Sequence, residues 1–171
     1  MSDDVQAVLI IGTYLSGKSS VAAEVADVLE RNGDPFALLD LDYLGWASAP
    51  GYDGHGDDPW LLLRNLRAVA GNDVAAGVRR FVVAGHVPDR VARDRILAML
   101  DMPVKVIRLE VPVVELERRA AADPTSGRRE DLAASRAQAA TGSTGVEDAT
   151  VRNDRPLRET ALEIIGLLGW A

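Results

Sequence analysis

Short apolar segments alternate with amphipathic segments along the whole chain. Runs of strand length are separated by stretches with apolar residues at helical spacing, such as Val21, Val25, Val28 and Leu29 on one helix face. This alternation predicts a parallel sheet with helices on both faces. We expect strands at about 7–11, 36–40, 81–84, 104–109 and 149–151, and helices at about 17–32, 59–77, 88–100, 112–122, 130–140 and 157–168.

The chain of 171 residues has no internal repeat and no linker-like segment, so we expect one domain spanning 1–171. Right-handed crossovers between the strands favour a doubly wound α/β sandwich of three layers. In such sheets, ligands bind at the carboxyl ends of the strands. That edge is expected to carry 12–19, Asp40–Asp42, Gly85–His86 and Glu110.

Residues 12–19 match the pattern G-x-x-x-x-G-K-[ST] between an apolar run and an amphipathic stretch. Gly12 and Gly17 allow backbone conformations that point N–H groups at a phosphate. Lys18, expected to be exposed, supplies a charge for the β and γ phosphates, and Ser19 a hydroxyl for Mg²⁺. A chance glycine-rich turn is the alternative, but the strand and helix flanks disfavour it. ATP binding is therefore assigned to Gly12, Thr13, Tyr14, Leu15, Ser16, Gly17, Lys18, Ser19 and Ser20.

Two carboxylates, Asp40 and Asp42, end the second predicted strand. One can reach the Mg²⁺ shell while the other faces an acceptor hydroxyl. The alternative is an ordinary turn after a strand, and the sequence leaves open which of the two aspartates is the base. Their position after the phosphate-loop helix favours the functional interpretation.

The composition limits the partners of the protein. A net charge of −7 argues against non-specific binding to nucleic acid or to membranes. The sequence contains no cysteine, no signal-peptide pattern and no apolar run of membrane-spanning length. We therefore expect a cytoplasmic monomer or homodimer that acts on a small molecule.

The motifs resemble the small-molecule kinases of the P-loop superfamily, including adenylylsulfate, shikimate and gluconate kinases and chloramphenicol phosphotransferase. Uncharacterised bacterial kinase-like ATP-binding proteins are also similar. The matched elements are 12–19, Asp40–Asp42 and the arginines Arg118, Arg119, Arg128 and Arg129. The resemblance implies a five-stranded sheet of order 2-3-1-4-5, a lid at about 123–131, and Mg-ATP-dependent phosphorylation of a small hydroxyl-bearing molecule. The adenylylsulfate kinase signature after the third strand is absent, since 84–89 reads Ala-Gly-His-Val-Pro-Asp.

The resemblance also implies roles for individual residues. Catalysis is assigned to Lys18, Asp42, Arg118 and Arg128, and Arg119 is added to the residues that bind the nucleotide. The acceptor is expected to contact Asp42, Arg64 and His86. Mg²⁺ is expected to bind Ser19 and Asp40. For the arginines, the alternative is a solvated helix face paired with Glu115 and Glu117. Tyr43 and Trp46 form an apolar wall for the acceptor or belong to the core.

Three functions remain open from the sequence. The leading hypothesis is a small-molecule phosphotransferase. A nucleotide-gated regulatory or binding module would use the same loop with little turnover. A nucleoside monophosphate kinase is the third, and the short stretch between Asp42 and Phe81 favours a smaller acceptor.

Overall fold

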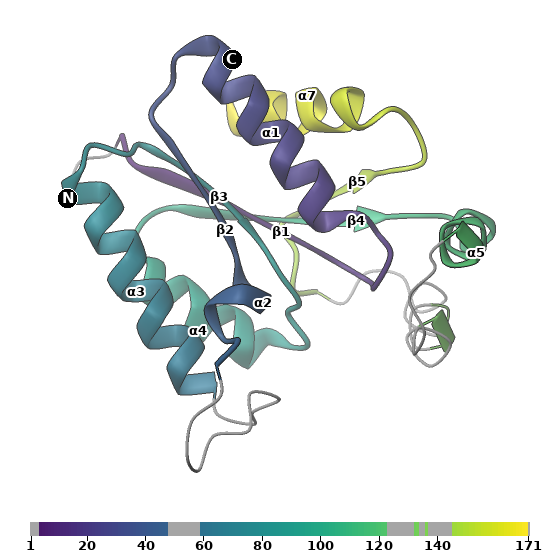
Figure 1. The fold of residues 1–171 in the computed structure, drawn as a ribbon, viewed down its shortest axis with the longest axis horizontal. Helices are drawn as coiled ribbons and strands as arrows, with labels where there is room; N and C mark the ends of the chain where they lie inside the picture. The colour runs from purple at the N-terminus through teal and green to yellow at the C-terminus, as the bar shows by residue number, and fades with distance from the viewer. Residues whose placement is uncertain (1–3, 48–58, 123–131, 134–135, 137–144, 171) are drawn as a thin grey trace.

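The chain folds around one five-stranded parallel sheet (Figure 1). The structure is a computed structural model that describes residues 4–47, 59–122, 132–133, 136 and 145–170. The strands stand in the order β2-β3-β1-β4-β5, which confirms the expected order 2-3-1-4-5. Their bounds are β1 Gln6–Gly12, β2 Phe36–Asp40, β3 Arg80–Ala84, β4 Val104–Glu110 and β5 Ala149–Arg152.

The central strand is apolar because both of its faces are covered. Val8, Leu9 and Ile10 of β1 are fully buried. Leu9 lies in register with Val83 of β3 on one side and Val106 of β4 on the other. A parallel strand buried on two faces is a continuous apolar run, which explains why the sequence pattern located it.

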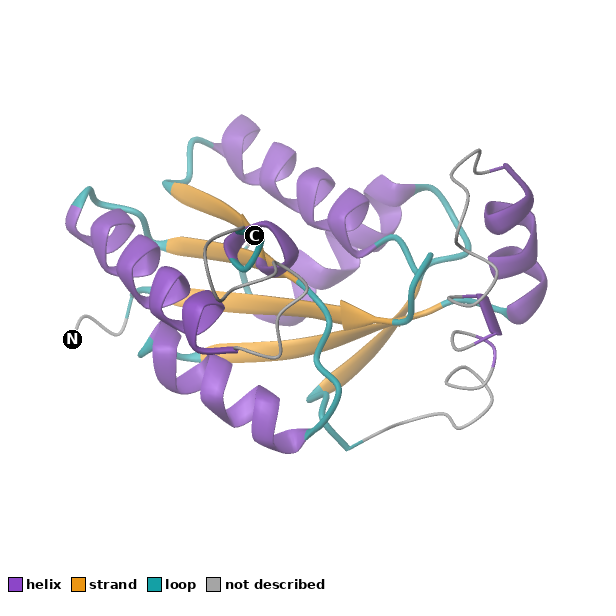
Figure 2. Cartoon of the chain, turned by 60° about the horizontal axis from the view of Figure 1, so that its bottom comes forward, coloured by secondary structure: helices purple, strands orange, loops and turns teal. Residues whose placement is uncertain are grey.

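Helices cover the sheet in two layers. Figures 1 and 2 show α1 and α7 on one face and α3 and α4 on the other, with α5 beyond the carboxyl end of β4. The bounds are α1 Lys18–Asn32, α3 Pro59–Ala75, α4 Arg90–Leu100, α5 Val113–Ala122 and α7 Leu157–Leu168. Val25 of α1 and Ile164 of α7 are fully buried in the same apolar cluster. The three-layer sandwich is therefore confirmed.

Two helix starts and one additional helix stand out as differences from the sequence prediction. The helix expected from Pro88 begins at Arg90, because the Asp89 side chain accepts a hydrogen bond from the Ala92 N–H at 2.8 Å and caps the helix. The helix expected from Pro112 begins one residue later, at Val113. A short helix that the sequence did not predict, α2 at Leu41–Leu44, follows β2 directly. Asp42 is thus a residue of this helix.

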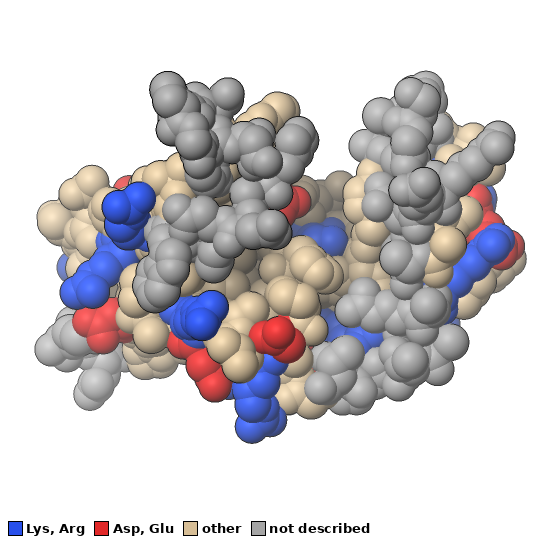
Figure 3. All heavy atoms as spheres, turned by 90° about the horizontal axis from the view of Figure 1, so that it is seen from below, with Lys and Arg blue, Asp and Glu red and all other residues tan. Residues whose placement is uncertain are grey.

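Two predicted features lie largely or entirely outside the described residues. These are the lid at 123–131, with Arg128 and Arg129, and most of the helix at 130–140. Among the helices that the structure does describe, none has the length and apolarity needed to cross a membrane. Figure 3 views the molecule from the side of α3 and α4, where acidic and basic side chains of the described residues are interspersed.

Candidate functional site

The loop between β1 and α1 has the backbone conformation that its glycines predicted. Gly12 and Gly17 have φ values of 155° and 86°, in the region that favours glycine. A side chain at Gly17 would also place its Cβ 2.7 Å from Nδ2 of Asn153. Leu15, between them, has a φ of 64°, which is rare outside glycine. The loop therefore holds a strained shape that its neighbours support, as functional loops do.

Lys18 folds back over this loop. Its Nζ donates hydrogen bonds to the carbonyl oxygens of Gly12 at 3.2 Å and Thr13 at 2.9 Å. The side chain is half-buried, so the expectation of an exposed Lys18 was wrong. Burial lowers the pKa of the ammonium below its ordinary value of 10.5, while Asp42 and Asp40 act in the opposite direction. A partly desolvated cation at the mouth of the loop suits the oxygens of a phosphate chain.

Ser19 and Asp40 are joined directly. The Ser19 hydroxyl donates to Oδ2 of Asp40 at 2.8 Å, and Oδ1 of the same carboxylate accepts from the Asp42 N–H at 3.0 Å. The second bond caps α2. Within the described part of the chain, no group of three His, Cys, Asp or Glu residues could hold a metal on its own. A hydroxyl and one carboxylate nevertheless fit Mg²⁺, which keeps several waters and takes its other ligands from phosphates.

Asp42 lies next to this pair because α2 packs closely on β3. A side chain at Gly85, directly after β3, would place its Cβ 2.6 Å from Cδ1 of Leu41. Only glycine leaves room there for the buried Leu41, and the adjacent Asp42 is exposed. Leu41 therefore anchors α2 while Asp42 stays accessible to a ligand.

His86 shares an electrostatic environment with these groups. Burial lowers the pKa of the imidazole below its ordinary value of 6.5, Lys18 lowers it further, and Asp42 opposes both effects. The residue still has an exposed surface, so the ring is crowded without being enclosed. Lys18, Asp42 and His86 are thus close enough to influence one another, as the strand-end argument predicted.

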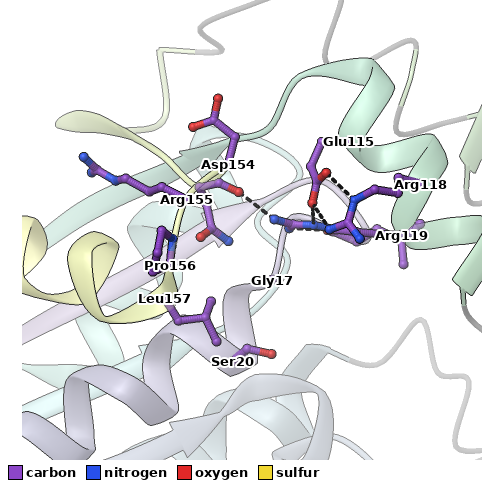
Figure 4. A pocket seen from close by; sticks show the side chains of 11 residues that line it. Gly17, Ser20, Glu115, Arg118, Arg119, Asp154, Arg155, Pro156 and Leu157 are labelled. Carbon is purple, nitrogen blue, oxygen red and sulfur yellow. Dashed lines mark hydrogen bonds and ion pairs between the residues drawn. The ribbon is translucent and has the colours of Figure 1, made fainter.

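Arg119 connects three segments of the site. Its guanidinium donates to Glu115 at 2.8 Å, to the Leu15 carbonyl at 3.1 Å and to the Asn153 carbonyl at 2.6 Å. Figure 4 shows Glu115 between Arg118 and Arg119. The hydrogen bonds from Arg118 and then Arg119 lower the pKa of Glu115 to about 2. Arg118 is itself 71% exposed, whereas Arg119 is held against the loop.

Asn153 belongs to the site through its side chain, a role that the sequence analysis did not predict. It is fully buried, and its Nδ2 donates to the Ser16 carbonyl at 2.7 Å. Its Oδ1 accepts from the Thr160 hydroxyl at 3.2 Å. The turn after β5 is thereby fixed to the loop at 12–19 and to α7. An asparagine in a polar turn carries no sequence signal for this contact.

A cavity of about 620 Å³ opens beside the loop. Figure 4 shows Arg118 and Arg119 on one side of it and Arg155 and Pro156 across from them. The lining residues come from the loop, α1, α5, the turn after β5 and the start of α7: Leu15, Gly17, Ser20, Glu115, Arg118, Arg119, Asn153, Asp154, Arg155, Pro156 and Leu157. The cavity is continuous with the loop, and its volume suits a nucleoside-sized ligand.

The other residues predicted for the site make fewer contacts with it in the described part of the chain, or lie outside that part. Arg64 is exposed on α3, and the neighbouring Asn65 donates through Nδ2 to the Leu44 carbonyl at 2.8 Å, which fixes this turn of α3 against α2. Thr13 is buried in the loop and Tyr14 is partly exposed. Arg128 lies outside the described residues.

A comparison with protein-family models finds no match, and no curated protein matches the chain. Solved structures do match over nearly the whole chain. A sugar kinase from Janibacter sp. HTCC2649 is 21% identical with a TM-score of 0.68, over 98% of this chain and 96% of the other. A gluconokinase from Sinorhizobium meliloti 1021 is 22% identical with a TM-score of 0.65, over 98% and 93%. The Mycobacterium tuberculosis APS kinase, in complex with AMPPNP and APS, is 24% identical with a TM-score of 0.62, over 97% and 98%.

These matches agree with the five-stranded sheet and its strand order. Each match covers at least 93% of both chains, so the likeness extends over the whole fold rather than one segment. Identities below a quarter carry information about architecture and not about substrate. The resemblance that the sequence motifs indicated is therefore confirmed at the level of the fold: this chain has the fold of the P-loop small-molecule kinases.

Proposed function

We propose that the protein is an ATP-dependent phosphotransferase that acts on a small hydroxyl-bearing molecule. The observation that carries the proposal is the arrangement at the carboxyl edge of the sheet. The loop at 12–19 holds Lys18 at its mouth, and Ser19 is bonded to Asp40 at 2.8 Å. Asp42, which is exposed, lies in α2 two residues after Asp40. A triphosphate site and a second, carboxylate-bearing site thus adjoin each other.

The triphosphate would occupy the loop, with its nucleoside in the 620 Å³ cavity beside it. Lys18 and the loop N–H groups bind the phosphate oxygens. Arg119 donates to the loop and to the turn after β5, so it would hold the phosphate-binding and nucleoside-binding parts of the site at a fixed distance. The AMPPNP in the similar APS kinase supports a triphosphate as the ligand of this fold.

Ser19 and Asp40 would hold Mg²⁺, which, when bound, neutralises charge on the phosphate oxygens. Asp42 would accept the proton of the acceptor hydroxyl. The acceptor oxygen then forms a bond to the γ phosphorus, the bond from that phosphorus to the ADP oxygen breaks, and ADP leaves. Lys18 and Arg118 stabilise the charge on the transferring group. Arg64 and His86 lie on elements that flank Asp42 and would contact the acceptor.

The names of the similar structures support a small acceptor. A sugar kinase, a gluconokinase and an APS kinase share this fold with the chain. The proposal treats residues 1–171 as one kinase-like domain. The lid at 123–131, with Arg128, remains part of the proposal and lies outside the described residues.

An acceptor screen tests the function directly. Purified protein with Mg-ATP is incubated with panels of hydroxylated metabolites and antibiotics, and ADP release is measured with and without each compound. Phosphorus NMR then identifies the phosphomonoester that forms. ADP release that depends on one acceptor, with a matching product signal, is the expected result. ATP binding without acceptor-dependent ADP release over the whole panel would instead indicate a nucleotide-gated module.

A further inference from the structure

Two aromatic side chains lie exposed beside the proposed acceptor site. Tyr43 and Trp46 stack on each other, with 6.0 Å between ring centroids and 22° between ring planes. Their exposed fractions are 69% and 74%. Among the described residues, the other large apolar side chains with high exposure are aliphatic. We call Tyr43 and Trp46 the aromatic pair.

The fold does not need the aromatic pair for its core. Leu41, on the same short helix, is the residue that packs into the apolar cluster under α3, and it is 2% exposed. Aromatic residues usually contribute most when they are buried, so two stacked rings in solvent represent a cost to solubility. A ligand-binding role explains their position better than packing does.

The backbone that carries the aromatic pair is held in place. The Trp46 N–H donates to the Tyr43 carbonyl at 3.2 Å, and the Gly45 N–H donates to the Leu41 carbonyl at 3.3 Å. In addition, Nδ2 of Asn65 on α3 donates a hydrogen bond to the Leu44 carbonyl at 2.8 Å. A platform whose backbone is already ordered loses little conformational entropy when a ligand binds.

The position of the aromatic pair relates it to phosphoryl transfer. Tyr43 directly follows Asp42, and α2 is capped by Asp40, which is bonded to Ser19 of the phosphate loop. A molecule lying on the rings and presenting a hydroxyl to Asp42 would contact α2, which carries Asp42 and Tyr43, and Trp46, two residues beyond the end of that helix.

We propose that Tyr43 and Trp46 form a stacking platform for the ring of the acceptor, and that this acceptor is a sugar with a pyranose ring. The inference rests on the proposed phosphotransferase function and specifies its substrate class. One face of a pyranose is lined by C–H groups and fits an aromatic surface, while its hydroxyls project sideways. Groups that accept or donate hydrogen bonds lie on α2 and on segments next to it: Asp42 on α2, Arg64 on α3, which packs against α2, and His86 after β3, which interacts with Asp42. An apolar floor with polar groups at its rim is the arrangement such a ring requires.

Paired acceptors test the ring requirement. Pyranoses such as D-glucose, D-galactose and N-acetyl-D-glucosamine are each compared with the open-chain alditol made by reducing them, and with the nucleoside uridine. The wild type, Trp46→Ala, Trp46→Phe and Tyr43→Ala are assayed for acceptor KM, ATP KM and kcat. Leu162→Ala, an exposed apolar truncation on α7, is the matched control.

A pyranose is expected to be phosphorylated in preference to its alditol. Trp46→Ala should raise the acceptor KM about tenfold and leave the ATP KM unchanged, because one stacking contact is lost. Trp46→Phe should restore most of the affinity, and Leu162→Ala should have no effect. Preference for an alditol or for uridine, or an unchanged acceptor KM in Trp46→Ala, would overturn the inference while the phosphotransferase function stands.

The platform can also be tested without turnover. Saturation-transfer NMR with the same sugars measures binding to wild type and to Trp46→Ala in the absence of ATP. Loss of sugar binding in Trp46→Ala supports the platform even when no acceptor-dependent ADP release is found. The lack of ADP release would then count against the proposed function alone. Equal binding in both proteins contradicts the platform. Sedimentation that shows wild type self-associating and Trp46→Ala monomeric would assign the aromatic pair to a protein interface instead.

Discussion

The Ser19 hydroxyl and the Asp40 carboxylate are hydrogen-bonded at 2.8 Å, although 21 residues separate them in the chain. One comes from the first turn of α1 and the other from the end of β2. The bond brings together the two groups that would serve as protein ligands of Mg²⁺. It also connects the start of α1 to α2, because the second oxygen of Asp40 caps α2.

Asp40→Asn should weaken the Mg²⁺ dependence of ATP binding without unfolding α2, since asparagine is an equally good helix cap. Calorimetric titrations with ATP, with and without Mg²⁺, measure the effect. Ser19→Ala should behave in the same way, and the double variant should lose little more than either single one, because both residues serve one ion. Full Mg²⁺ stimulation in Asp40→Asn would remove Asp40 from the metal site.

Asp42→Asn should retain Mg-ATP binding and lose phosphoryl transfer. The change removes the proton acceptor and keeps the side-chain size, so the rate should fall by about 10²–10⁴-fold, as is typical of general base catalysis. Single-turnover kinetics with the acceptor from the screen give the rate. Asp27→Asn, an exposed aspartate on α1, is the matched control. Transfer at the wild-type rate would show that the base lies elsewhere.

Lys18→Ala should reduce ATP affinity by about tenfold to a hundredfold, the value of a charged hydrogen bond. The chain offers a close control, because its other lysine, Lys105, lies far from the loop and donates to the Leu167 carbonyl. Lys105→Ala should bind ATP as the wild type does. Circular dichroism verifies that both variants fold, and equal ATP affinity in all three proteins would contradict the nucleotide site.

Glu115→Gln should lower nucleotide affinity several-fold, because Arg119 loses the carboxylate that positions it against Leu15 and Asn153. It should also change acid stability. The pKa of Glu115 is about 2 in the folded protein against an ordinary value of 4.5. Its stabilising contribution is therefore complete above pH 4.5 and is lost as the pH falls toward 2.

Urea unfolding between those pH values measures that contribution, and Glu115→Gln should show a shallower loss of stability. Glu117→Gln is the matched control on the same helix, since Glu117 pairs with Arg136 and not with Arg119. Identical pH profiles for wild type and Glu115→Gln would refute the role of this ion pair.

His86 provides a test that needs no substrate. Its pKa, below 6.5 in the wild type, should fall further in Asp42→Asn and rise in Lys18→Ala, because those side chains act on it with opposite signs. Proton NMR titration resolves the shift, and His55, the only other histidine, serves as the second signal. Shifts of the same sign in both variants would be inconsistent with the described geometry.

The sequence alone was sufficient to locate the loop at 12–19 and the strands of the sheet. The chemistry of Gly12–Ser19 is contained in consecutive residues, so its spacing is visible without a fold. The strands could be located because buried parallel strands are continuous apolar runs, whereas their order was implied by the resemblance to the P-loop small-molecule kinases. Local propensity also located α1 and α7 closely, since each presents one apolar face.

Only the tertiary structure determined how the site is held together. Asn153 contacts Ser16 across 137 residues, and Arg119 contacts Leu15 across 104. These contacts depend on where packing places the turn after β5 and helix α5, and no local pattern encodes that. The helix α2 was missed for the same reason, because its anchor Leu41 packs closely against Gly85, which follows β3. Residue spacing reports chemistry within one segment, whereas contacts between distant segments arise from the free energy of packing the whole chain.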